Sequence, residues 1–175
     1  MAASSSTDFR LGRYTWPLVP TLTVAIAILL TVLPYGFSRG IFTTPAFALI
    51  PVFFWATYKP DLLPIPIVFL LGLGQDLVTA GPVGLWAVVF LITYSVTLWQ
   101  SEQIEGQPFR VQWLGFAAAT AVGLVAGWFL ASVYFSEFLQ PLPILTQAVA
   151  TTLVFPLVAW LFIFLEREVT AHQRH

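Results

Sequence analysis

The chain has 175 residues, of which 58% are hydrophobic and 9% are charged, and its mean hydropathy is +0.87. A soluble domain is about 45–50% apolar and about 25% charged, so this composition predicts a chain dissolved in lipid, with no room left for a separate soluble domain. The net charge of −1 comes without a cluster of Lys and Arg, which argues against nucleic-acid binding, and the absence of cysteine excludes disulfides and thiolate metal sites.

Apolar runs that can cross a bilayer recur along the chain. A helix crosses the hydrocarbon core with roughly 20 residues, and six runs approach or meet this length. In chain order the predicted spans are 17–34, 42–58, 62–79, 83–100, 113–135 and 144–165. A polar segment, residues 1–15, precedes them, and a polar tail, residues 166–175, follows them. The sequence therefore predicts an all-α, polytopic bundle of six transmembrane helices that forms a single membrane domain.

Prolines and aromatic residues refine these spans. Pro64 and Pro66 lie in the first turns of the third span, where a missing backbone N–H is tolerated. Pro156 predicts a kink in the sixth span. Trp and Tyr recur near the ends of the runs, as at Trp99, which is typical of the interface between lipid and water.

The distribution of basic residues predicts the orientation. With six spans and a cytoplasmic N-terminus, six of the seven Lys and Arg residues are cytoplasmic and Arg39 alone is outside. Without a span at 62–79, four of the seven would lie outside. Because basic residues favour the cytoplasmic side, we predict that both termini are cytoplasmic.

A glycine-rich stretch between the third and fourth spans holds Asp76, a carboxylate within an apolar run. A charge inside a membrane is costly, but Asp76 lies roughly 22 Å of helix beyond Asp61, near the periplasmic surface. We expect a structural role in which its carboxylate accepts hydrogen bonds from the backbone N–H groups of Gly81 or Gly84. Contact with a partner and a role in proton or cation transport stay open as alternatives.

The fifth span carries a small residue at every fourth position. These residues form a stripe on one side of a helix, and such stripes let membrane helices pack closely. Packing within the chain is one interpretation, and a groove for a partner's membrane helix or for a second copy in a homodimer is the other. The stripe consists of Gly115, Ala119, Gly123, Gly127 and Ala131.

The sequence offers no pattern for catalysis or for a cofactor. Both histidines, His172 and His175, lie in the tail, so no span contains a histidine base or ligand. The Gly72–Gln75 run lacks the Lys-Ser/Thr ending of a phosphate-binding loop. We therefore expect no enzymatic activity, no cofactor and no metal.

Several motifs between residues 43 and 94 carry a family resemblance. They are Thr44-Pro45, Trp55 with Lys59-Pro60, Phe69–Leu77, Gly81–Leu85 and Val88–Tyr94. Together they resemble the bacterial rod shape-determining protein MreD family, whereas the rest of the chain is similar to it only in hydropathy, size and span number. The family-motif positions, which are also possible partner contacts, are Gly72, Gly74, Gln75, Asp76, Gly81, Pro82 and Gly84.

The resemblance implies a non-catalytic scaffold in the bacterial inner membrane, within the cell-elongation machinery that builds peptidoglycan. The implied partners are MreC, through its single transmembrane helix, and, directly or indirectly, MreB, RodA and a class B penicillin-binding transpeptidase. The family's fold is thought to be similar to the substrate-binding subunits of energy-coupling-factor vitamin transporters, so a small-molecule importer subunit is the alternative. That alternative predicts a pocket near the periplasmic face, involving Trp86, Trp128, Gln75 and Asp76.

Overall fold

The computed structural model describes residues 18–32 and 44–172, and the side chains of residues 18–31 and 44–158. All regular secondary structure in these ranges is helical, which confirms the all-α prediction. The helices are α2 (Leu18–Val32), α3 (Leu49–Tyr58), the 3-10 turn η1 (Pro60–Leu62), α4 (Ile65–Thr79), α5 (Leu85–Ile104), α6 (Phe109–Phe135) and α7 (Leu142–His172).

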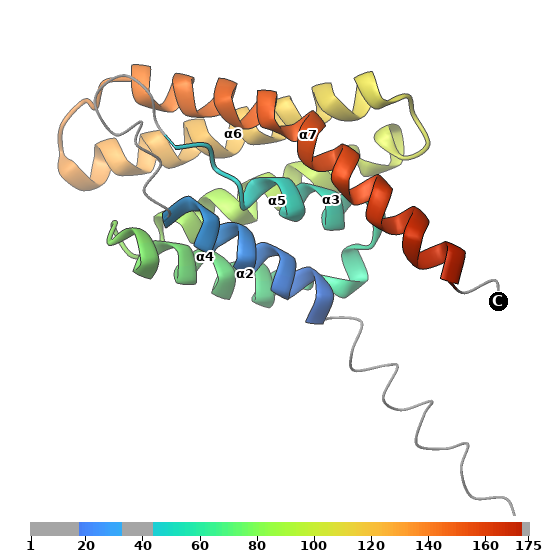
Figure 1. Ribbon diagram of the computed structural model, residues 1–175. Helices are drawn as coiled ribbons and strands as arrows, with labels where there is room; N and C mark the ends of the chain where they lie inside the picture. The colour runs from blue at the N-terminus through green and yellow to red at the C-terminus, as the bar shows by residue number, and fades with distance from the viewer. Residues whose placement is uncertain (1–17, 33–43, 173–175) are drawn as a thin grey trace, which may run out of the picture.

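Successive helices run in alternating directions along one bundle (Figure 1). The loop between α4 and α5, residues 80–84, and the loop between α6 and α7, residues 136–141, therefore lie at the same end. We call this end the glycine-loop end. The turn η1 and the loop between α5 and α6, residues 105–108, lie at the opposite end.

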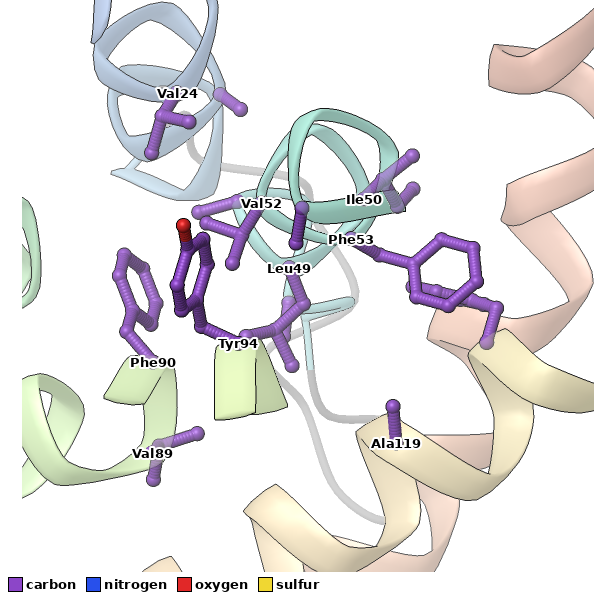
Figure 2. Close-up of a cluster of buried hydrophobic side chains, with 14 of the residues drawn as sticks. Val24, Leu49, Ile50, Val52, Phe53, Val89, Phe90, Tyr94 and Ala119 are labelled. Atoms are coloured by element: carbon purple, nitrogen blue, oxygen red, sulfur yellow. The ribbon is translucent and has the colours of Figure 1, made fainter. Parts of the chain in front are cut away.

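The short helix α3 occupies the centre of the bundle. Its residues Leu49 and Val52 have no exposed surface. Figure 2 shows the side chains of α3 pointing outward in several directions, toward Val24 of α2, Phe90 of α5 and Ala119 of α6. Because neighbours surround α3, an apolar sequence on all of its sides is buried, whatever solvent surrounds the bundle.

Three aromatic rings tie α3 to α6 and α7. Phe53 meets Phe116 edge-on at 5.3 Å between ring centroids, and Phe155 edge-on at 5.7 Å. Phe116 and Phe155 stack on each other at 4.3 Å. Each such contact contributes about 0.5–1.5 kcal/mol beyond the buried area, so the three rings fix α3 between the two longest helices.

Within the described part of the second predicted span, 42–58, helix begins only at Leu49. Residues 44–46 are not helical, and α3 begins at Leu49. The sequence contained a signal for this start, because Pro51 lacks an N–H and fits in a first helical turn, and Pro45 disfavours helix at the residue before it. The helical prediction was therefore wrong for residues 44–46, and residues 42 and 43 lie outside the described residues.

The non-helical segment before α3 is held by side chains of α7. The backbone N–H of Ala46, which is 2% exposed, donates to Thr151 Oγ1 at 2.9 Å. Gln147 Nε2 donates to the carbonyl oxygen of Thr44 at 3.0 Å. Buried backbone groups need such partners, so α7 supplies the hydrogen bonds that a longer α3 would have made internally.

Other helix boundaries also differ from the hydropathy pattern. The expected loop 101–112 shrinks to residues 105–108, because α5 continues to Ile104 and α6 begins at Phe109. Helical hydrogen bonding continues through the polar residues that flank each apolar run, whereas a span predicted from hydropathy ends at the first of these polar residues. The helix α7 contains Pro156 and changes direction partway along its length (Figure 1). Residues 33–43, with Arg39, lie outside the described residues.

By length and composition, α6 is the one helix among the described residues that is long and apolar enough to cross a membrane. The shorter apolar helical segments are Leu18–Thr31, Leu49–Tyr58, Ile65–Thr79 and Leu142–Val158. Helix length alone therefore does not establish six crossings.

Candidate functional site: the α4–α5 corner and the adjoining cavity

The glycine-rich stretch forms a tight corner between α4 and α5. The helix α4 ends at Thr79 and is followed by Ala80, which has a left-handed conformation with φ of 51°, and Gly84 precedes α5 with φ of 97°. A side chain at Gly84 would be strained at this φ. The sequence therefore places a glycine where the chain enters α5.

Asp76 closes this corner with two hydrogen bonds. Its Oδ2 accepts from the N–H of Gly84 at 2.7 Å, and its Oδ1 accepts from the N–H of Trp86 at 2.8 Å. The side chain is 1% exposed. A carboxylate at a helix N-terminus satisfies unpaired N–H groups and interacts favourably with the helix dipole, so Asp76 caps α5 from the preceding helix.

The sequence predicted that the Asp76 carboxylate accepts from Gly81 or Gly84, and the structure shows that the donor is the N–H of Gly84. The N–H of Gly81 donates instead to the main-chain oxygen of Asp76, at 3.3 Å, as part of the helix ending. The bond to Trp86 was not foreseen. Both carboxylate oxygens are thus used inside the chain.

The two glycines of α4 lie in different surroundings. A Cβ at Gly72 would be 2.3 Å from Ala87 Cα and 2.8 Å from Ala87 N, so the backbones of α4 and α5 touch here. A Cβ at Gly74 would meet nothing within 4 Å. Of these two family-motif positions, only Gly72 is required for close packing.

Gln75 lies beside Asp76 but points to another helix. Its side chain is 1% exposed, and Nε2 donates a long hydrogen bond of 3.4 Å to Thr31 Oγ1 of α2. Its Oε1 has no hydrogen-bond partner within the described part of the chain. Pro82, in the corner loop, is half-buried.

The small-residue stripe of α6 faces α5 of the same chain over much of its length. A Cβ at Gly123 would be 2.1 Å from Thr93 Oγ1, and one at Gly127 would be 2.5 Å from Val89 Cγ2. Near the other end, the carbonyl of Gly115 accepts a hydrogen bond of 2.9 Å from Gln100. This face is therefore covered by α5, which leaves it unavailable to a partner helix.

A cavity of about 290 Å³ lies beside this corner, at the glycine-loop end. It is lined by Leu85, Trp86, Val89, Leu124, Gly127, Trp128, Ala131, Leu139, Gln140, Pro143, Ile144 and Gln147. These residues belong to α5, α6, α7 and the loop between α6 and α7. Trp86 and Trp128 are present, as the importer alternative predicted, whereas Gln75 and Asp76 do not line it.

The polar groups of the lining are mostly paired within the chain. The indole N–H of Trp128 donates to the carbonyl of Leu139 at 3.1 Å, and Gln147 donates to Thr44. Gln140 is exposed. None of the described residues that line the cavity is an Asp, Glu, His, Lys or Arg, so this lining can hold an apolar group but offers no side chain for acid–base chemistry.

Within the described ranges, no three His, Cys, Asp or Glu residues gather in a way that could hold a metal ion. Comparisons of the chain with protein-family models, with curated proteins and with solved structures found no match.

Proposed function

We propose that this chain is a non-catalytic scaffold of the MreD kind, with six spans in the bacterial inner membrane. In this proposal it binds the single transmembrane helix of MreC and helps to couple cytoplasmic MreB filaments to peptidoglycan synthesis. The membrane placement rests on the apolar outer surface of the bundle, and the family assignment rests on the sequence pattern around Asp76.

Large apolar side chains are exposed on every long helix of the bundle. Examples from α2, α4, α5, α6 and α7, in that order, are Leu22 at 61%, Leu77 at 75%, Trp99 at 79%, Phe129 at 63% and Leu157 at 71%. Soluble monomers rarely expose apolar patches beyond a few hundred Å², whereas a lipid-facing surface is apolar throughout. This surface is the observation that supports a membrane location for the whole bundle.

Short helices are compatible with this placement. The 15 residues of α4 extend about 22 Å, and a bilayer adapts to a short apolar stretch by local thinning. The even shorter α3 is enclosed by other helices. Non-helical backbone at membrane depth is tolerated where protein buries it and satisfies its hydrogen bonds, as α7 does for Thr44 and Ala46.

Charge placement supports cytoplasmic termini. Lys59 and Arg110 lie at the end opposite the glycine loops, where positive charge favours the cytoplasm. Because the chain has no cysteine, single introduced cysteines report their location cleanly. We expect E137C, in the loop between α6 and α7, to react with a membrane-impermeant maleimide in spheroplasts, and E105C to react only after lysis. Reaction of both residues in sealed spheroplasts, or of E105C alone, would contradict the proposed orientation.

The partner surface is expected on an outer face of the bundle. The motif around Asp76 and most of the α6 stripe are occupied by contacts inside the chain. A photoreactive residue introduced singly at Leu22, Leu77, Val125 or Val149 samples the exposed faces of α2, α4, α6 and α7. We expect cross-links to MreC from one face or two adjacent faces, measured in membranes that contain both proteins.

Two outcomes would count against the scaffold proposal. One is the absence of any MreC cross-link although the cysteine labelling shows a correctly inserted chain. The other is equal cross-linking from all four faces, because chance collision in the bilayer has no preferred side.

The importer alternative rests on the cavity with its two indole side chains. A vitamin also carries polar groups that need partners when buried, and the lining supplies few free ones. A vitamin that raises the thermal midpoint of the purified chain would favour this alternative, because a ligand specific for the folded state stabilises it.

A further inference from the structure

The cavity lies beyond the start of α3, which is only half as long as a spanning helix. On the side of the aromatic cluster, α3 lies between α5 and α7 and contacts α6. Toward the glycine-loop end, α3 has already ended in the segment 44–46, and no residue of α3 lines the cavity. Among the residues that the structure describes, no helix therefore occupies the space beyond the start of α3, between α5 and α7 and over α6.

The contact between Gln147 and Thr44 marks the inner limit of this space. Gln147 lines the cavity, and its amide binds the carbonyl oxygen of the non-helical segment. Its amide donor is therefore already engaged. Apart from Gln140, the other described lining residues are aliphatic, aromatic, proline or glycine, which favours a hydrocarbon occupant.

The volume of the cavity fits a hydrocarbon chain but not a transmembrane helix. An apolar cavity of about 150 Å³ holds a benzene molecule, so about 290 Å³ accommodates a hydrocarbon segment of roughly ten carbons. A transmembrane helix is about 10 Å across and requires far more space. A partner's helix could insert at most one or two side chains here.

The surface beside the cavity is apolar and continuous with the outer surface of the bundle. Phe138 is 83% exposed in the loop between α6 and α7, and Leu142 is 50% exposed at the start of α7. In a bilayer these side chains contact lipid chains directly. Lipid acyl chains are therefore the apolar molecules nearest to this apolar cavity.

We propose that the cavity binds one acyl chain of a phospholipid, at the glycine-loop end of the bundle. The inference rests on the membrane placement in the proposed function and does not depend on MreC. The bound chain lies against the apolar side chains of α5, α6 and α7 that line the cavity.

The test uses the full-length protein in nanodiscs of phosphatidylglycerol, a fraction of which carries a photoreactive diazirine near the end of one acyl chain. After irradiation and digestion, mass spectrometry locates the labelled residues. We expect enrichment of label at Trp128, Ala131 and Ile144 over the outward-facing positions Leu22 and Val125, by at least several-fold.

A matched pair of substitutions on α6 provides the control. A131W places an indole in the cavity lining, whereas A118W places the same group on the exposed face of the same helix. We expect A131W to reduce the label at Ile144 at least fivefold and A118W to leave it unchanged. If A131W does not fold, I144W tests the same space from α7, with Trp128 as the position that is read.

Three results would overturn the proposal. Label spread evenly over cavity and outer positions indicates general lipid contact only. Label at the cavity that A131W and I144W leave unchanged places the lipid elsewhere. Loss of cavity label when MreC is bound, together with a cross-link from Trp128 to MreC, assigns the space to a partner side chain. Because the cysteine labelling measures insertion separately, each result is distinguishable from failure of the membrane proposal.

Discussion

Replacing Asp76 with alanine is expected to unfold the corner between α4 and α5 and to cause one of the largest stability losses of any single polar substitution in the chain. Asp76 accepts two short hydrogen bonds, from the N–H groups of Gly84 and Trp86, and it is 1% exposed. Hydrogen bonds to charged groups contribute about 1.5–3 kcal/mol each. Losing both bonds leaves two N–H groups at the start of α5 without a partner, so we expect a loss of about 3–6 kcal/mol.

The asparagine variant separates charge from geometry. In D76N the amide oxygen can accept one of the two hydrogen bonds, but the amide nitrogen must face the other N–H, so we expect most of the destabilisation to remain. The control is D61N, since Asp61 is exposed. Reversible unfolding in mixed dodecyl maltoside and SDS micelles measures the difference. If D76N is as stable as wild type, the negative charge is not what holds the corner.

The contact made by Asp76 could be predicted because its signals are local. Asp76 and Gly84 are eight residues apart, the apolar context makes an unpaired carboxylate costly, and the glycines mark a turn. The choice between Gly81 and Gly84 could not be made in this way. It depends on where α5 begins, and only Gly84, at φ of 97°, directly precedes that helix.

The half-length α3 shows what hydropathy leaves out. Hydropathy does not distinguish an apolar helix from apolar non-helical backbone that is buried in protein. The apolar run 42–58 was therefore predicted as one span. What permits the break is a pair of distant side chains, Gln147 and Thr151, which bind the segment across more than 100 residues of sequence. The prolines at 45 and 51 indicated the helix start, but no local pattern indicates which distant groups satisfy the backbone.

The cavity lies beside this break, and no local pattern in the sequence indicates its full lining. The importer alternative predicted a pocket near the periplasmic face that involves Trp86 and Trp128, and both line the cavity. The same alternative also placed Gln75 and Asp76 in this pocket, and they do not line it. Their polar atoms are instead directed to Thr31 and to the start of α5, since buried polar groups in an apolar bundle bind the nearest available donor or acceptor.

Adding one methyl group at Gly72 is expected to be disruptive, whereas the same change at Gly74 is not. A Cβ at Gly72 would lie 2.3 Å from Ala87 Cα and 2.8 Å from Ala87 N, so the backbones of α4 and α5 must separate. Overpacking of this kind costs about 1–3 kcal/mol. We expect G72A to lose about that amount, and G72L to yield little folded protein. The same unfolding assay in mixed micelles measures both variants.

The matched control is the glycine two residues along the same helix. A Cβ at Gly74 would meet nothing within 4 Å, and alanine favours helix over glycine by up to about 1 kcal/mol, so G74A is expected to match or exceed wild-type stability. The double variant G72A/A87G tests whether the backbone or the side chain of residue 87 obstructs the new methyl group. Its new methyl group still faces the Cα and N atoms of residue 87, so removing the Ala87 side chain should not restore stability. If it does, the helices meet through side chains and the corner is less tightly closed than the backbone contact indicates.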